Sequence, residues 1–205
     1  DLRMMLDILT SPGWLRSLVK NGQPRFANLK PYAAENASVG EVVGFARREM
    51  RGAFTWDEVA RYRDRWKRPL VVKGILHPQD AEQAVALGVD GIFVSNHGGR
   101  QIEALPPPID CLPAVVAKVG GRATVMMDGG IRSGLDVIRA VALGAAAAFA
   151  GKAFLWGLGA LGSEGPQHVI DLMIEEAQAA LGQIGARSLA EARTVVIRHP
   201  GALHL

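Results

Sequence analysis

The sequence predicts an α/β fold in which parallel strands alternate with helices. From Pro69 onward, short apolar runs rich in β-branched residues alternate with helix-like stretches. Such near-continuous apolar strands are typical of parallel sheets that are covered on both faces. The tetrapeptide VALG occurs at 85–88 and again at 141–144, each time before another apolar run. A repeated βα unit favours a (β/α)8 TIM barrel over an open sheet.

Four strand and helix pairs are predicted in order after residue 68. The strands are expected at 69–74, 90–96, 123–130 and 145–153. The helices are expected at 78–88, 111–121, 133–144 and 165–185, and several of them end on glycine. Pro113 fits only the first turn of its helix, because proline lacks the N–H group that later turns need. The fourth strand is alanine-rich and is assigned by its position, since alanine is a poor strand former.

Residues 1–68 show no comparable series of strands. Helical stretches are expected at 1–9, 38–50 and 56–67. Residues 11–37 form a long irregular segment that mixes aromatic, aliphatic and basic side chains. A segment of this kind fits a lid or a membrane-surface element, with a plain surface insertion as the alternative. Because a (β/α)8 barrel takes about 250 residues, four strands make half of one, and we expect the first half to be missing.

Composition narrows the class of protein. The chain has 205 residues, of which 49% are hydrophobic and 21% charged, which is typical of a globular domain with a substantial core. The net charge of +3 is small and spread along the chain, so it fits an anionic ligand and does not indicate nucleic-acid binding. The single cysteine, Cys111, suggests a reducing, cytoplasmic compartment. We expect no transmembrane helix, and the start at Asp1 suggests that other residues precede it.

Each predicted strand ends in polar or charged residues. The active sites of parallel α/β folds lie at the carboxyl ends of the strands, so these residues are expected around one rim. The four strand ends are Lys73-Gly74, Ser95-Asn96-His97-Gly98-Gly99-Arg100, Asp128-Gly129-Gly130-Ile131-Arg132 and Gly151-Lys152.

The last two strand ends predict a phosphate site. Glycines let the backbone approach a ligand closely, and N–H groups at the helix start after Arg132 are expected to attract an anion. The Arg132 guanidinium can bind phosphate oxygens in a fork, with a solvated helix-start arginine as the alternative. Gly151-Lys152 is a second phosphate-facing element, and barrels commonly bind phosphate after strands seven and eight.

The first two strand ends predict acid–base chemistry beside a carboxylate. His97 is a candidate base because its ordinary pKa lies near neutrality. Arg100 can hold a carboxylate with two hydrogen bonds. Lys73 can stabilise negative charge that develops on an electron-rich ring, or form a structural ion pair with a carboxylate of the barrel. His77, His168, His199 and His204 lack such surroundings and receive no role.

Together, VVKG, VSNHGGRQ and DGGIRSG…ALGA…GKAF closely resemble the FMN-dependent α-hydroxy-acid oxidases and dehydrogenases. This family includes glycolate oxidase, flavin-type L-lactate dehydrogenase and mandelate dehydrogenase, and the resemblance is strong from about Thr55 to Arg187. It implies a (β/α)8 barrel of which residues 55–205 form the carboxyl-terminal half, strands five to eight. Residues 1–54 then resemble the loop and helices that follow strand four.

The resemblance also implies a role for each candidate site residue. Lys73 lies near the N1/O2 side of the isoalloxazine and Ser95 contacts the flavin. His97 is the catalytic base beside the flavin, and Arg100 grips the substrate carboxylate. The residues that correspond to the family's contacts with the ribityl and phosphate groups of FMN are Asp128, Gly129, Gly130, Arg132, Gly151 and Lys152. Lysine at 152 replaces an arginine of the family, which keeps the charge but loses the planar fork. No metal site is expected.

The implied function is FMN-dependent oxidation of a small L-2-hydroxy acid, similar to lactate, glycolate or mandelate, to the 2-oxo acid. The implied partners are the missing amino-terminal half, without which the segment is not expected to catalyse, and further copies in a homo-oligomer, commonly a tetramer. Peripheral contact with the inner face of the membrane through residues 11–37 is left open. The alternatives are a non-flavin phosphate-binding barrel enzyme and a non-catalytic FMN-binding half-barrel. The sequence does not identify the electron acceptor. It also does not decide whether the reaction follows a carbanion route or a hydride transfer.

Overall fold

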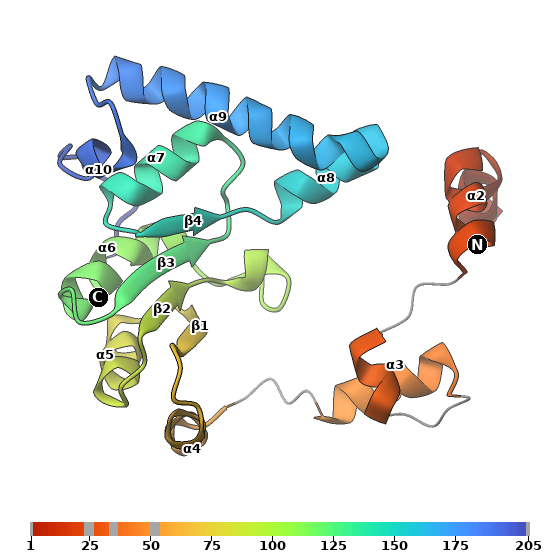
Figure 1. The fold of residues 1–205 in the computed structure, drawn as a ribbon, viewed down its shortest axis with the longest axis horizontal. Helices are drawn as coiled ribbons and strands as arrows, with labels where there is room; N and C mark the ends of the chain where they lie inside the picture. The colour runs from red at the N-terminus through yellow and green to blue at the C-terminus, as the bar shows by residue number, and fades with distance from the viewer. Residues whose placement is uncertain (1, 23–26, 33–36, 50–53, 204–205) are drawn as a thin grey trace. The chain divides into compact units, whose positions relative to one another are not determined.

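A computed structural model describes residues 2–22, 27–32, 37–49 and 54–203 of the chain (Figure 1). The chain divides into two compact units, Asp1–Phe54 and Thr55–Leu205. Each unit is described by itself below.

The first unit is helical in its described residues. Its elements are α1 (Leu2–Leu9), α2 (Pro12–Asn21), the 3₁₀ helix η1 (Ala27–Tyr32) and α3 (Val39–Glu49). The expectation of an irregular segment at 11–37 is therefore wrong for 12–21 and 27–32. Helix α2 forms because Pro12 suits a first helical position and Gly22, with φ of 72°, ends the helix. Arg25 and Phe26, two basic and aromatic members of that segment, lie outside the described residues.

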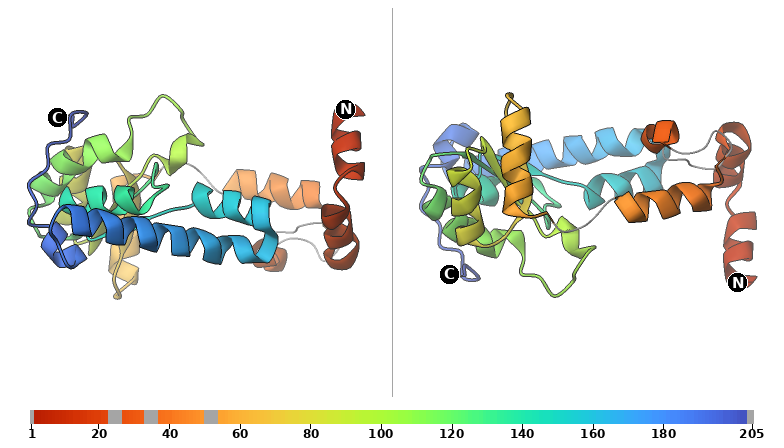
Figure 2. Two further views of the ribbon diagram at one scale, coloured as in Figure 1. Left: turned by 90° about the horizontal axis from the view of Figure 1, so that it is seen from above. Right: turned by 90° about the horizontal axis from the view of Figure 1, so that it is seen from below.

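The second unit contains a four-stranded parallel sheet whose strands follow one another in space as they do in sequence (Figures 1 and 2). The strands are β1 (Val71–Ile75), β2 (Gly91–Val94), β3 (Thr124–Asp128) and β4 (Ala147–Phe149). The connecting helices are α5 (Pro78–Ala86), α6 (Pro108–Val119) and α7 (Gly134–Ala142). The predicted alternation of parallel strands and helices is thus confirmed.

Further helices flank the sheet in this unit. Helix α4 (Trp56–Arg65) precedes β1, and η2 (His97–Gly99) follows β2. After β4 come α8 (Lys152–Leu161), η3 (Gly162–Glu164), α9 (Gly165–Gln183) and α10 (Leu189–Ala192). Figure 2 shows the long α9 running beside α7 and α8. No helix among the described residues is both long and apolar enough to cross a membrane.

Two element boundaries differ from the sequence expectation. Helix α6 begins at Pro108, so Pro113 lies in its second turn and not in its first. The helix tolerates the lost hydrogen bond because its buried face, with Leu112 and Val115, packs in the core. The fourth strand ends at Phe149, and Lys152 already opens α8, so the expected strand at 145–153 is wrong in its second half.

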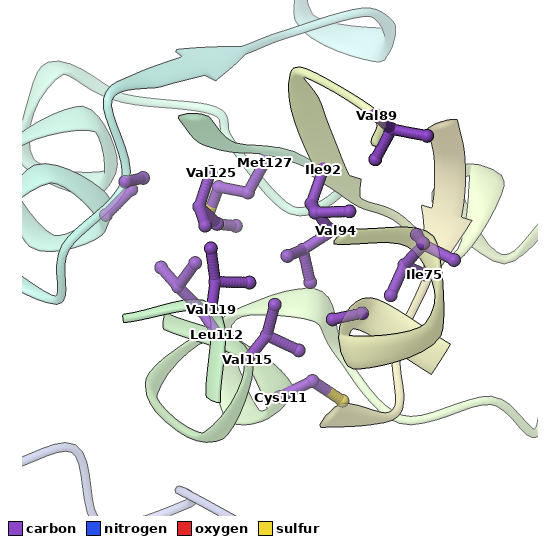
Figure 3. Packing of buried hydrophobic residues seen from close by; sticks show 14 of the residues in the cluster. Ile75, Val89, Ile92, Val94, Cys111, Leu112, Val115, Val119, Val125 and Met127 are labelled. Atoms are coloured by element: carbon purple, nitrogen blue, oxygen red, sulfur yellow. The ribbon is translucent and has the colours of Figure 1, made fainter. Parts of the chain in front are cut away.

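The core lies between the sheet and α6 (Figure 3). Ile92 and Met127 of the strands and Leu112 and Val115 of α6 have no exposed surface. Each such side chain contributes about 1.5–3 kcal/mol to stability when it is fully buried. This packing covers one face of the sheet and fixes the direction in which the alternate side chains of each strand point.

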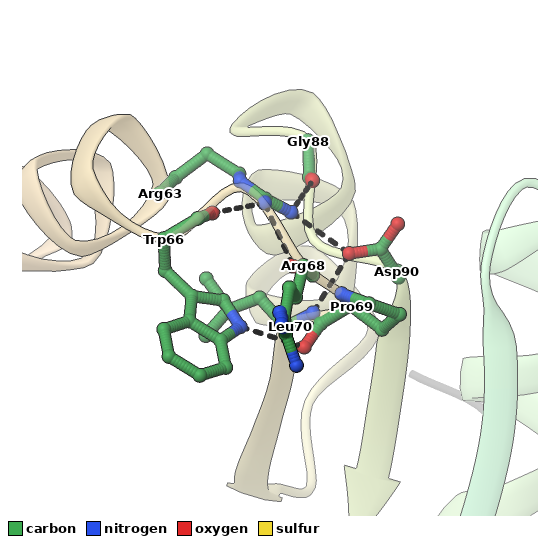
Figure 4. A network of polar contacts seen from close by, with 7 residues as sticks. All are labelled: Arg63, Trp66, Arg68, Pro69, Leu70, Gly88 and Asp90. Atoms are coloured by element: carbon green, nitrogen blue, oxygen red, sulfur yellow. Dashed lines mark hydrogen bonds and ion pairs between the residues drawn. The ribbon is translucent and has the colours of Figure 1, made fainter.

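A polar network at the amino ends of β1 and β2 attaches α4 to the sheet (Figure 4). The Arg63 guanidinium contacts Asp90 Oδ2 at 2.8 Å, and the same oxygen accepts a hydrogen bond from the Leu70 N–H at 2.8 Å. The Leu70 N–H, together with Arg63, holds the pKa of Asp90 below its ordinary value. Arg63 also donates to the carbonyl oxygens of Trp66, Arg68 and Gly88. The polar groups of this network are therefore engaged in structural contacts at the amino ends of β1 and β2.

Candidate functional site

Strand register places several candidate residues on one face of the sheet. Lys73 pairs with Phe93 of β2, and Asp128 pairs with Phe149 of β4. Side chains alternate along a strand, and Ile92 and Met127 point into the core under α6. Lys73, Phe93, Asp128 and Phe149 therefore share the opposite face, near the carboxyl ends of the strands.

Lys73 is the centre of a polar cluster on that face. Its Nζ lies 2.9 Å from Asp128 Oδ2 and donates a hydrogen bond to Ser95 Oγ at 2.8 Å. The same ammonium lies 5.2 Å from the centroid of the Phe93 ring, within the range of a cation–π contact. The ion pair that was the structural alternative for Lys73 is present. Its side chain is still 40% exposed, so a ligand on the open face can reach it.

The Asp128 carboxylate has one oxygen without a partner. Oδ2 bonds Lys73, whereas Oδ1 is buried and has no hydrogen-bond partner among the described residues. A buried acceptor left without a donor costs about 1–3 kcal/mol. Such an atom beside an accessible cation is a place where a hydroxyl group of a ligand would complete the hydrogen bonding.

The loop after β2 holds His97 in an unusual backbone conformation. His97 has a φ of 55° and is the one non-glycine residue with positive φ in the described part of the chain. Its N–H donates to Ser95 Oγ at 3.1 Å, which ties the loop to the Lys73 cluster. A Cβ on Gly74 would lie 3.2 Å from His97 Cε1, so the imidazole sits over the glycine that follows Lys73. The structure thus brings the ends of β1 and β2 together at His97.

Arg100 and the His97 imidazole are both exposed. Arg100 follows the last residue of η2. Neither side chain forms a hydrogen bond or ion pair with another described residue, so their polar groups are available to a ligand. The structure does not bring Arg100 into the Lys73 cluster.

The ends of β3 and β4 form a second, glycine-rich part of the site. Because Asp128 pairs with Phe149, Gly129 and Gly130 leave the sheet beside the segment that leads to Lys152. Both glycines have positive φ, and a Cβ on Gly129 would lie 2.9 Å from Asn96 Oδ1. Only glycine fits there without moving its neighbours.

Two cations flank these glycines. The Arg132 guanidinium lies 5.3 Å from the centroid of the Trp156 ring on α8, in a cation–π contact. Lys152 Nζ donates a hydrogen bond to the Gly98 carbonyl at 2.7 Å. The glycine backbone and two cations on adjacent strand ends form a suitable environment for a phosphate group.

Side chains already bond the backbone N–H groups at and just before the start of α7, where the sequence led us to expect an anion. Asp136 Oδ2 accepts from the N–H groups of Arg132 and Ser133, and Glu176 Oε2 accepts from the Gly134 N–H at 2.8 Å. At the start of α8, the N-cap residue is Gly151, which has no side chain that could cap the helix.

Sequence reasoning missed three residues that shape the site. Phe93 and Phe149 form a tilted aromatic pair with ring centroids 4.8 Å apart, beside Lys73. The alternation of side chains along β2 was a usable signal for Phe93, because it places Phe93 opposite the buried Ile92. Trp156 carried no such signal, because the helix it belongs to was not predicted.

Residues 1–199 match the family described as FMN-dependent dehydrogenase. This chain belongs to that family. L-lactate dehydrogenase of Pectobacterium atrosepticum is 38% identical over 190 residues, which cover 92% of this chain and 49% of that protein. L-lactate dehydrogenase of Allorhizobium ampelinum is 39% identical over 192 residues, covering 93% and 51%.

Solved structures agree with this assignment. The monotopic membrane protein (S)-mandelate dehydrogenase matches with a TM-score of 0.86 and 35% identity over 94% of this chain and 50% of that chain. Mandelate oxidase with (S)-2-phenylpropionate matches with a TM-score of 0.65 and 45% identity, covering 68% and 42%. The chain therefore spans about half the length of these relatives. The expected family, the half of a (β/α)8 barrel and FMN as the family's cofactor are confirmed.

Proposed function

We propose that the complete protein oxidises a small L-2-hydroxy acid to the 2-oxo acid with FMN. This chain contributes the carboxyl-terminal half of the barrel. The observation that carries the proposal is the cluster of Lys73, Ser95 and Asp128 beside the His97 loop, at the carboxyl ends of parallel strands. A cation, an unpartnered carboxylate oxygen and an exposed imidazole lie there on neighbouring strand ends.

The residues present fit FMN. Asp128 Oδ1 would accept a hydrogen bond from a ribityl hydroxyl, which removes the cost of its burial. Lys73 would stabilise negative charge at the N1/O2 side of the ring. Gly129, Arg132 and Lys152 would hold the phosphate. When bound, FMN supplies a two-electron acceptor for the substrate's α-carbon.

Two side chains would act on the substrate. The Arg100 guanidinium, with no ion-pair partner among the described residues, can hold the substrate carboxylate in a fork. This contact places the α-carbon near His97, which takes up a proton from that carbon or from its hydroxyl group. The Lys73 ammonium, 2.9 Å from Asp128, stabilises the charge that the reaction delivers to the ring.

The test is His97→Gln in the complete protein, followed by stopped-flow flavin reduction with a 2-hydroxy acid. FMN should stay bound, and reduction should slow by about 10²–10⁴-fold, the usual contribution of a general base. His168→Gln, at an exposed position on α9, is the matched control and should reduce at the wild-type rate. Fast reduction in His97→Gln would remove His97 from this role. A colourless protein without absorption near about 450 nm would favour the non-flavin barrel instead.

We further propose that residues outside this sequence supply the first four strands and that the complete barrels associate as tetramers. The half-length match to the relatives supports the first statement. Mixing this chain with an amino-terminal half should restore flavin reduction that the chain alone lacks. Activity of the chain alone would contradict the first statement, and light scattering would give the number of subunits.

A second proposal concerns the first unit: peripheral contact with the cytoplasmic face of a membrane through residues 11–37. In α2, Trp14 is 50% and Val19 86% exposed, on a helix that also carries Arg16 and Lys20. Exposed apolar and basic side chains on one helix suit an anionic lipid surface. The double variant Trp14→Ser with Val19→Ser should sediment less with anionic vesicles than wild type. Equal sedimentation would argue against this contact.

A further inference from the structure

We infer that Lys152 is a positioning residue for the loop that carries His97 and Arg100. This role is additional to a phosphate contact, and it rests on the proposed function. Lys152 follows β4, whereas the loop follows β2, so the lysine side chain crosses the end of the intervening strand β3.

The contact is direct and specific. Lys152 Nζ donates to the Gly98 carbonyl at 2.7 Å, across 54 positions of sequence. A Cβ built on Gly98 would find Lys152 Cε at 3.6 Å and Nζ at 3.8 Å as its nearest neighbours. The end of the lysine side chain therefore lies beside Gly98, and its ammonium group bonds the carbonyl oxygen.

Both backbone polar groups of Gly98 form hydrogen bonds. Its N–H donates to Asn96 Oδ1 at 3.0 Å, while its carbonyl accepts from Lys152. Its φ is 69°, directly after the φ of 55° at His97. A left-handed conformation at a non-glycine residue costs about 1–2 kcal/mol, so external bonds must hold it. Loss of the Lys152 bond would let the loop relax and would displace His97 and Arg100 together.

Lysine suits this double role better than arginine does. An ammonium group has three donors, so one bond to Gly98 leaves two for a phosphate. A guanidinium in the same place would be drawn to the phosphate by its planar fork. Lys152 thus links the phosphate end of the proposed site to the loop that carries His97 and Arg100.

The test compares Lys152→Met, Lys152→Arg and the exposed control Lys67→Met in the complete protein at saturating FMN. Lys152→Met should slow flavin reduction and raise the KM for the 2-hydroxy acid, each by about ten- to a hundredfold, the usual effect of a hydrogen bond to a charged group. Lys152→Arg, whose guanidinium is drawn to the phosphate, should keep FMN bound but recover only a small part of the rate, and Lys67→Met should match wild type. A second readout is amide hydrogen exchange at Gly98, which should be faster in Lys152→Met without any substrate.

Saturation with FMN separates the possible outcomes. If Lys152→Met regains the wild-type rate once FMN saturates, and Gly98 exchange is unchanged, Lys152 contacts only phosphate and the inference fails. If the wild type reduces no flavin at all, the proposed function fails, while Gly98 exchange in the complete protein still decides the loop role. Should Lys152→Met fail to fold by circular dichroism, Lys152→Gln is put through the same two measurements and judged by the same criteria.

Discussion

Gly134, the first residue of α7, lies directly against the backbone of α9. A Cβ at this position would lie 2.2 Å from the carbonyl oxygen of Met173 and 2.3 Å from the backbone nitrogen of Ala177. Both obstacles are backbone atoms of α9, so no rotamer change relieves the overlap. Gly134→Ala therefore forces the two helices apart.

The size of the effect follows from this geometry. The helices would have to separate by about 1 Å at a close-packed contact, which places the change at the upper end of overpacking, about 3 kcal/mol. For a domain of this size, that loss corresponds to a fall of about 6–12 °C in Tm. The hydrogen bond from the Gly134 N–H to Glu176 would weaken as well, because α9 supplies the acceptor.

The change in Tm is measured by thermal unfolding followed by circular dichroism. Gly159→Ala is the matched control, because it lies in α8 with nothing within 4 Å of its Cβ position. Alanine there should stabilise the protein by about 0.5–1 kcal/mol, the ordinary gain over glycine in a helix. An unchanged Tm for Gly134→Ala would show that α7 and α9 do not meet as closely as described. Because α7 directly follows the loop with Arg132, weaker FMN binding should accompany the lower Tm.

Two further predictions rest on shifted pKa values. Because the folded pKa of Asp90 lies below its unfolded value, its contribution to stability is present above about pH 4 and is lost as pH falls through the folded pKa. Asp90→Asn should therefore be less stable than wild type to urea at pH 7, with the gap narrowing as pH falls below about 4, and equal stability at pH 7 would contradict the network with Arg63. Burial raises the pKa of the Cys111 thiol, so a thiol reagent at pH 8 should react only as fast as the protein unfolds. Rapid labelling under native conditions would contradict this burial.

Local patterns in the sequence were sufficient for most of the second unit. The apolar runs identified the strands because parallel strands bury both faces, and Pro78 marked the start of α5 as proline at a first helical position does. The polar residues at the strand ends followed from the same pattern, since the parallel direction places every carboxyl end on one edge. The sequence alone therefore places Lys73, His97 and Asp128 at the same edge of the sheet.

Contacts between distant parts of the chain could not be predicted in this way. Glu176 occupies the start of α7 from 42 residues away, and Lys152 reaches Gly98 across 54 residues. Neither pairing leaves a periodic or compositional trace in the sequence. Helix α2 was missed for a different reason, because its short apolar and basic stretch fits an irregular loop equally well.

The open face of the sheet bears on the catalysis proposed for the complete protein. On the face of the sheet opposite α6, Lys73 is 40% and Phe149 46% exposed. Water reaching this face screens the attraction between Lys73 and Asp128, and an exposed ion pair of this kind is worth about 0–1 kcal/mol. Covering the face lowers the local dielectric constant and strengthens the effect of the same lysine on a developing charge. Under the proposed function, this chain supplies side chains that hold the cofactor, and the rest of the barrel supplies the environment that makes them effective.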